Sequence, residues 1–223
     1  MSKFPNYAAS RPHPGKDHDR FYISPDEQTF AVFDGAGDDA ASNFAQLFFA
    51  QHHPRTGSTL TPENRLARLF RDTQNFLISS VGGRILTTGT ALSLQSIDGG
   101  LSASYAHAGD SRLYAYKPGS QLLERLTTDE SERLPTGQID AHNFLGSRHH
   151  ILRQLGTYAM PADTRFLLVT DGFVDEYYEG YVPDERIAEI LGAAATPQAA
   201  VQELQAACSV PDDATAVAVF GRT

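Results

Sequence analysis

The sequence predicts an α/β layered (α+β) domain in which strands stack in the middle and helices lie outside. Two observations predict it. Between residues 89 and 116 apolar residues follow a period of two and are interrupted by turn signals, which is typical of antiparallel hairpins. Segments with helical apolar spacing occur in pairs on both sides of this stretch. The 223 residues suit one domain, residues 1–223, with residues 1–14 as an extended lead-in.

The first element is a short buried strand. Residues 29–33 (TFAVF) are apolar and β-prone, and the run ends abruptly at Asp34. A helix should follow, because Phe44, Leu47 and Phe48 recur at i, i+3 and i+4. These three side chains are therefore expected to form its apolar face.

A second helix is predicted to start at residues 61–63. Thr61 is an N-cap candidate, Pro62 suits the first turn and Glu63 adds an acid there. The apolar residues after this start lie on one stripe: Leu66, Leu69, Phe70, Phe76 and Leu77. This helix should pack beside the first one.

The middle of the chain predicts three consecutive antiparallel strands. Residues 91–97 and 101–108 are joined by the hairpin turn Asp98-Gly99-Gly100, and residues 112–116 form the third strand. Residues 127–148 are polar and irregular. No regular element is predicted there.

The last third of the chain repeats the pattern of a strand followed by paired helices. Residues 165–170 (RFLLVT) form a strongly buried strand that ends at Asp171. One helix carries the apolar residues of 187–191, and another starts at Thr196. Residues 215–220 (TAVAVF) are the final strand. All expected elements therefore belong to one layered architecture.

Composition excludes several classes of protein. The chain has 27 acidic and 18 basic residues and a net charge of −9. This argues against a nucleic-acid-binding surface, which needs clustered Lys and Arg to contact phosphates. Its single cysteine excludes a disulfide framework and cysteine-rich zinc modules. No apolar run approaches 18 residues, and the first 20 residues contain no hydrophobic segment of signal-peptide length. A cytoplasmic protein without a membrane partner is expected.

Four aspartates share one kind of position, at the end or the entry of a strand. Asp34 and Asp171 end buried strands, Asp110 lies in a tight connection between strands, and Asp212 precedes the last strand. Strand ends on one edge of a sheet assembly lie close together, and crowded carboxylates repel one another unless a cation binds. Oxygen-only donors select Mg²⁺ or Mn²⁺ over Zn²⁺. Any single Asp-Gly is usually just a turn, as Asp98-Gly99 should be, but four matched positions indicate a metal site.

The glycines after Asp34 support this interpretation. Gly35 and Gly37 allow the backbone to approach a bound ion closely, and a backbone carbonyl there can serve as a further ligand.

Seven short motifs resemble those of metal-dependent serine/threonine protein phosphatases of the protein phosphatase 2C type, in a short, bacterial-like form. They follow the family's order over roughly residues 15–220. In chain order they are Phe33-Asp34-Gly35-Ala36-Gly37 for VFDGxGG, Thr88-Gly89-Thr90-Ala91 for GTTA, Ala108-Gly109-Asp110-Ser111-Arg112 for GDSR, Leu126-Thr127-Thr128-Asp129 for LTxDH, Leu152-Arg153-Gln154-Leu155-Gly156 for LxRxLG, Val169-Thr170-Asp171-Gly172-Phe173 with Asp175 for SDGxxD, and Asp212-Asp213-Ala214-Thr215 for DNxT. Each motif is weak by itself, but the series is specific.

The resemblance implies a central β-sandwich of antiparallel sheets flanked by helix pairs (αββα), with a two-metal centre at one edge. Asp34 would bridge two Mn²⁺ or Mg²⁺ ions and the Gly35 carbonyl would complete one of them. Asp171 and Asp212 would hold the second ion, and Asp110 with Asp171 a third, weaker one. Asp19 resembles the last residue of an amino-terminal NED-type motif and would act near the metals.

The implied activity is hydrolysis of phosphoserine and phosphothreonine in proteins. Asp34 and Asp171 would act through a metal-bound water, without a covalent phosphoenzyme. The implied partner is a phosphorylated protein substrate in signalling, and the enzyme would oppose a serine/threonine kinase.

Three residues depart from the family pattern. Ala36 stands where many relatives have a histidine or methionine, so a histidine general acid is missing there. Pro14 occupies the position of the family's phosphate-binding arginine, and His18 replaces the acid beside Asp19. These departures leave open an alternative, a catalytically weak or inactive family member that acts as a regulatory binding module.

The residue that binds phosphate therefore stays open. Arg11, Lys16 and Arg20 are candidates, although none matches the family arginine by spacing. The effect of Ala36 on activity, the protein substrate and the oligomeric state also stay open.

Two other functions fit less well. Residues 35–40 match GxGxxA of a dinucleotide site, but two aspartates would face the pyrophosphate where negative charge already binds. Cys208 lacks the arginine six residues later that a cysteine phosphatase needs, so it should pack on the apolar face of its helix. The pairs at 52–53 and 149–150 are interpreted as surface histidines rather than metal ligands.

Overall fold

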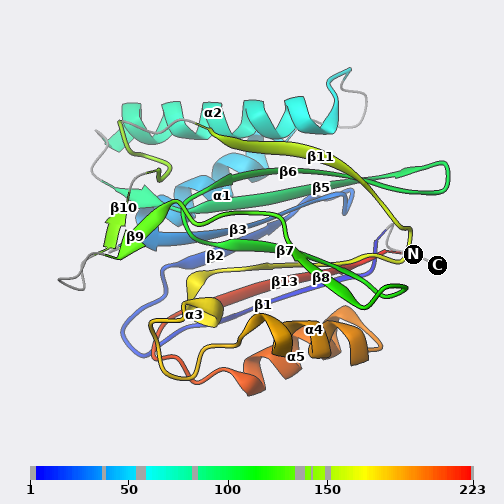
Figure 1. Cartoon of the computed structure of the whole chain (residues 1–223). Helices are drawn as coiled ribbons and strands as arrows, with labels where there is room; N and C mark the ends of the chain where they lie inside the picture. The colour runs from blue at the N-terminus through cyan, green and yellow to red at the C-terminus, as the bar shows by residue number, and fades with distance from the viewer. Residues whose placement is uncertain are drawn as a thin grey trace.

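Two antiparallel sheets pack face to face between two layers of helices (Figure 1). The computed structural model describes residues 4–36, 39–53, 59–81, 85–133, 139–141, 143–148 and 152–221. Helices α1 and α2 cover one sheet, and α4 and α5 cover the other. The αββα sandwich that the resemblance implies is therefore confirmed.

The first sheet contains the hairpins of the middle of the chain. Its strands run in the order β11-β6-β5-β3-β2, with β4 paired to β3 beside this path. The bounds are β2 (Asp19–Ile23), β3 (Thr29–Ala36), β4 (Leu86–Thr87), β5 (Gly89–Ile97), β6 (Gly100–Ala108) and β11 (Gln154–Met160). Asp98 and Gly99 join β5 to β6 as expected, with Gly99 at a φ of +79°.

The second sheet has the strand order β1-β13-β12-β7-β8. Its bounds are β1 (Asn6–Arg11), β7 (Arg112–Lys117), β8 (Leu122–Arg125), β12 (Arg165–Val169) and β13 (Ala214–Phe220). The extended lead-in thus contains a strand, β1, which pairs along its whole length with the C-terminal β13.

A further two-stranded sheet lies in the segment that the sequence leaves irregular. β9 (Ser131–Arg133) pairs with β10 (Ile139–Ala141). Its short strands carry no apolar alternation, so pattern analysis over 127–148 does not find them.

The helices begin close to where the capping signals place them. Their bounds are α1 (Ala40–His52), α2 (Pro62–Val81), α3 (Asp171–Val174), α4 (Asp184–Ala193) and α5 (Pro197–Ala207). Thr61 accepts a hydrogen bond from the Asn64 amide at 3.3 Å, and Thr196 accepts one from the Ala199 amide at 3.1 Å. Within the described ranges, no helix has both the length and the apolar character that crossing a bilayer requires.

The predicted apolar face of α1 is partly wrong. Leu47 is 53% exposed, and the buried face instead carries Ala41, Ala45 and Phe49. Small alanines let the helix approach the sheet closely, while Phe48 turns sideways to the Phe76 ring of α2, 5.3 Å away. In α2, by contrast, Leu66, Leu69, Phe70 and Leu77 are buried as expected.

Alternation along the strands divides the interior into three apolar clusters. On β3, Phe30 and Val32 face the space between the sheets, whereas Ala31 and Phe33 face α1 and α2. On β12, Phe166 also faces the space between the sheets. Each fully buried side chain of this size contributes about 1.5–3 kcal/mol. This packing fixes the ends of β3 and β12 at the same edge of the sandwich.

Candidate metal centre

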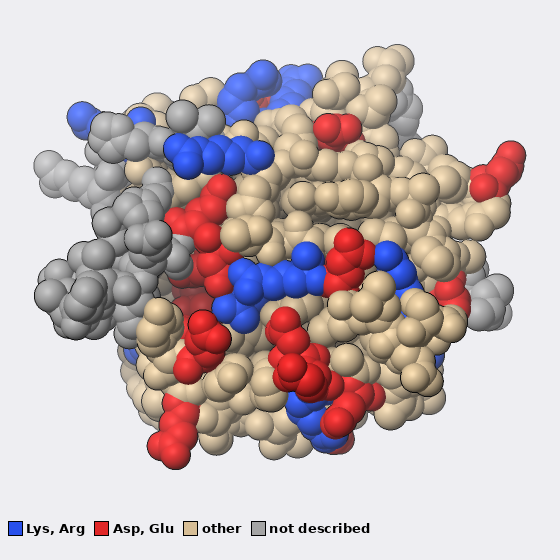
Figure 2. Space-filling view, viewed as in Figure 1, with Lys and Arg blue, Asp and Glu red and all other residues tan. Residues whose placement is uncertain are grey.

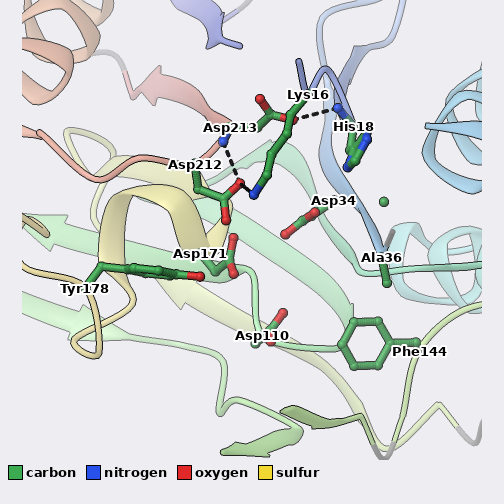
Figure 3. A pocket seen from close by; sticks show the side chains of 11 residues that line it. Lys16, His18, Asp34, Ala36, Asp110, Phe144, Asp171, Tyr178, Asp212 and Asp213 are labelled. Atoms are coloured by element: carbon green, nitrogen blue, oxygen red, sulfur yellow. Dashed lines mark hydrogen bonds and ion pairs between the residues drawn. The ribbon is translucent and has the colours of Figure 1, made fainter. Parts of the chain in front are cut away.

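Four predicted metal residues meet at one edge of the sandwich. Asp34 lies near the end of β3, Asp110 in the β6–β7 connection, Asp171 at the start of α3, and Asp212 just before β13. They line one cavity of about 490 Å³. Figure 3 shows Asp34, Asp110 and Asp171 pointing into the same space from different elements of the fold. The remaining lining residues are Lys16, His18, Gly35, Ala36, Phe144, Tyr178 and Asp213.

Hydrogen bonds hold the β3 end that carries Asp34. The Asp34 amide donates to Thr88 Oγ1 at 3.0 Å, and Thr87 Oγ1 donates to the Asp34 carbonyl at 2.8 Å. The threonine-rich motif beside Gly89 therefore acts by fixing the first aspartate. Gly35 lines the cavity, whereas Gly37 lies outside the described residues.

The β6–β7 connection that carries Asp110 is equally constrained. Gly109 has a φ of +101°, and a Cβ there would lie 2.8 Å from Thr88. Its carbonyl accepts the Glu130 amide at 2.7 Å and faces His107 Nε2 at 3.0 Å. The GDSR match and the LTxDH match contact each other at this turn. Their last matched residues, Arg112 and Asp129, form an ion pair with 2.8 Å between a guanidinium nitrogen and a carboxylate oxygen.

The carboxylates are crowded enough to disfavour their own charge. Burial, followed by the charge of Asp110, raises the pKa of Asp171 to about 8. Burial, followed by the charges of Asp171 and Asp19, raises the pKa of Asp34 well above its usual value. A divalent cation would remove this penalty.

Asp19 is the register partner of Asp34 on the neighbouring strand β2, and it is not among the residues that line the cavity. It is 3% exposed, and its Oδ2 accepts a 2.7 Å hydrogen bond from Thr170 Oγ1. Its Oδ1 is buried without a hydrogen-bond partner in the described structure. A buried carboxylate oxygen without a donor favours a cation or an ordered water as its partner.

The donor chemistry fits a hard divalent cation. The four aspartates offer oxygen donors only, and the cavity includes the Gly35 backbone. Within the described ranges, no group of three or more His, Cys, Asp or Glu side chains has the geometry of a finished metal site. In Figure 3, Asp212 has the ammonium of Lys16 as its partner.

Of the three phosphate-binding candidates, Lys16 alone lines the cavity. Arg11 donates to the carbonyls of Cys208 and Val210 at 2.8 and 3.0 Å, so it ties down the chain after α5. Arg20 binds Asn43 and Asp17 on the outside of the site. Cys208 is buried beneath α5, in agreement with a packing role.

Sequence reasoning missed three cavity residues. Phe144 arrives with a segment whose Leu145 amide donates to Thr87 O at 2.9 Å, and Tyr178 comes from the loop after α3. Asp213 lies beside the expected Asp212. Asp175, the last position of the SDGxxD match, does not line the cavity but accepts the Tyr177 amide at 3.0 Å, which turns the chain toward Tyr178. The SDGxxD match, through Asp175, is the sequence feature that could have indicated Tyr178 as a site residue.

Charged side chains of both signs lie on the face of the molecule shown in Figure 2. Figure 2 shows acidic side chains gathered at the left of this face, next to a band of basic ones. The left side of Figure 1 is also where β3 ends and α3 begins, next to the candidate site. Acidic side chains therefore gather on the same side of the molecule as the candidate site.

Several known structures with the same fold are bacterial serine/threonine phosphatases. The Mycobacterium tuberculosis phosphatase PstP/Ppp is 21% identical, with 99% of each chain covered and a TM-score of 0.79. Stp1 from Staphylococcus aureus is 20% identical over 100% of this chain and 96% of that one, with a TM-score of 0.77. The catalytic domain of PstP in complex with two manganese ions is 22% identical over 98% and 99%, with a TM-score of 0.76.

No protein-family model matches the chain, and no curated protein matches it significantly by sequence. At these identities the structural likeness establishes the fold. It is the fold of the phosphatases that the motifs resemble.

Proposed function

We propose that this protein is a metal-dependent phosphatase that hydrolyses phosphoserine and phosphothreonine in proteins. The observation that carries the proposal is the convergence of Asp34, Asp110, Asp171 and Asp212 on one cavity. A fold shared with serine/threonine phosphatases and the ordered series of motifs support it.

The cofactor would be two Mn²⁺ or Mg²⁺ ions. Asp34 and the Gly35 carbonyl would hold one, and Asp34, Asp171 and Asp212 the other, with Asp110 available to a third, weaker ion. One similar structure, that of PstP, contains two manganese ions. When bound, such ions supply the Lewis acidity that activates water for attack on phosphorus.

The chain's own residues would orient the reaction. Asp19, fixed by Thr170 and paired in register with Asp34, would act near the metals without lining the cavity itself. Lys16 supplies the positive charge that a phosphate requires, and it reaches the cavity from a loop clamped by Asp213. Ala36 offers no proton, so the leaving group would take its proton from water.

The physiological setting follows from this chemistry. The substrate would be a phosphorylated protein in a signalling process, and the enzyme would oppose a serine/threonine kinase. We place the protein in the cytoplasm, without nucleic-acid or membrane partners, and treat residues 1–223 as one catalytic domain.

One second function has a specific observation in its favour. Ala36 stands at the cavity wall where a general acid would be, and Lys16 already neutralises Asp212. Both features suit a weak or inactive phosphatase that binds phosphoproteins as a regulatory module.

Activity on p-nitrophenyl phosphate and on a phosphothreonine peptide separates the two functions. The purified protein should turn over both substrates with Mn²⁺, lose activity in EDTA and lose it in Asp171→Asn. Asp98→Asn is the matched control, because it alters an Asp-Gly that is only a hairpin turn and leaves a favoured Asn-Gly. Bound Mn²⁺ without turnover would establish the regulatory module instead.

A further inference from the structure

Lys16 and Asp212 form an ion pair inside the candidate site. Lys16 Nζ lies 2.7 Å from Asp212 Oδ1, and the two side chains are 41% and 21% exposed. The same oxygen accepts the Asp213 amide at 2.8 Å, which fixes the orientation of the carboxylate. The ammonium therefore lies on an oxygen that a divalent cation would need.

The loop that carries Lys16 is constrained to keep it there. Both oxygens of Asp213, which is 4% exposed, accept backbone amides of this loop, from His13 at 2.6 Å and from His18 at 2.7 Å. The loop turns at Gly15, which has a φ of +86°, and the Lys16 amide donates to His13 O at 2.9 Å. These hydrogen bonds hold the backbone of the loop that carries Lys16, and none of them involves the Lys16 side chain.

We propose that Lys16 is a tethered internal cation that competes with a divalent ion for Asp212. Binding of the ion would displace the ammonium from Asp212 while the clamped backbone keeps it in the cavity, where it would face an anionic group. The affinity for the ion at Asp212 is therefore set partly by the chain's own lysine. This inference rests on the proposed metal site.

Calorimetric titration with Mn²⁺ tests the competition without any activity measurement. Lys16→Met, which keeps length but removes charge, should bind the ion at Asp212 about three- to tenfold more tightly than the wild type. Lys16→Arg should bind within about twofold of the wild type because the charge remains. Lys117→Met is the matched control, since Lys117 makes an ion pair of the same length, 2.7 Å, with Glu124 on β7 and β8.

The titration separates failure of this inference from failure of the metal site. Equal or weaker Mn²⁺ binding by Lys16→Met, with binding still lost in Asp171→Asn, overturns the competition but leaves the proposed function intact. No Mn²⁺ binding by the wild type or by Lys16→Met overturns both.

Chemical labelling of the wild-type protein decides the matter even if a variant fails to fold. The chain has three lysines, Lys3, Lys16 and Lys117, so acetylation is easily mapped by mass spectrometry. Saturating Mg²⁺ should raise the acetylation rate of Lys16 several-fold and leave that of Lys117 unchanged. An unchanged or lower rate at Lys16 would show that the ion does not displace the ammonium.

Discussion

Asp19 and Asp34 are register partners on neighbouring antiparallel strands, β2 and β3. Directly opposed like charges destabilise a strand pair, and here the Asp19 side chain is also buried. Packing on both faces of the sheet, from Phe30 to Phe33, overrides this repulsion. Repulsion between buried carboxylates therefore destabilises the edge of the sandwich at which the candidate site lies. Such a cost favours a functional role for these carboxylates.

Asp171→Asn should abolish Mn²⁺-dependent activity and yet stabilise the metal-free protein. It removes one charge from a cavity where Asp110 and Asp34 are close. In EDTA at pH 8 the gain should be about 2 kcal/mol, or about 4–8 °C in Tm. Thermal melts of the variant, the wild type and Asp98→Asn measure it. A lower Tm for Asp171→Asn than for the wild type would show that the carboxylates are not under strain.

His107 should make the protein sensitive to acid. It is fully buried, with Nδ1 2.8 Å from Thr90 Oγ1 and Nε2 3.0 Å from Gly109 O. Because a carbonyl can only accept, the neutral ring carries its proton on Nε2. Burial, which outweighs the opposing charge of Asp129, lowers the pKa of His107 from 6.5 to about 4.

The sign of the pH dependence follows from this lowered pKa. Between pH 6.5 and 4 His107 is protonated in the unfolded chain but stays neutral in the folded protein. The free energy of unfolding therefore keeps its full value above pH 6.5 and decreases as the pH falls toward 4. The loss should reach about 3 kcal/mol. Urea unfolding at pH 7.5 and 5 should show a smaller pH difference in His107→Gln, whereas the exposed His52→Gln should behave as the wild type.

Asp213→Asn should loosen the loop that carries Lys16. An amide side chain has one accepting oxygen, so it cannot accept the His13 and His18 amides as the carboxylate does. Hydrogen exchange at these two amides should accelerate about five- to tenfold. The Leu126 amide, which donates to Leu113 O, is the internal reference. Unchanged exchange at His13 and His18 would mean that Asp213 does not hold the loop.

Gly172→Ala should disrupt the start of α3. A Cβ at this position would lie 1.7 Å from the Asp213 carbonyl oxygen, so the backbone of one of the two segments would have to shift. The expected loss of stability is about 3 kcal/mol or more, about 6–12 °C in Tm. Gly119→Ala, where a Cβ meets nothing within 4 Å, should change little. Similar melting temperatures for the two variants would contradict this account.

Local pattern was sufficient for most elements. The alternation along β5 and β6, the apolar runs of β12 and β13 and the threonine caps of α2 and α5 depend on neighbouring residues, so the sequence predicts them. The same holds for Asp34 and Asp171, because strand ends are local features. β1 escapes prediction because its pairing with β13 joins Asn6 to Val219, at opposite ends of the chain.

The sequence alone determined the layered fold class, the series of motifs and which aspartates stand at strand ends. Only the tertiary structure decided that Lys16, rather than Arg11 or Arg20, reaches the cavity, and that Tyr178 lines it. The tertiary structure also shows why the two Asp-Gly pairs differ. Gly172 is required because the Asp213 backbone lies close to it, whereas Gly99 has a turn conformation and open space around it. The physical reason is that turns and caps depend on neighbours in the chain, whereas the partner of a long charged side chain depends on which distant segments packing brings within its reach.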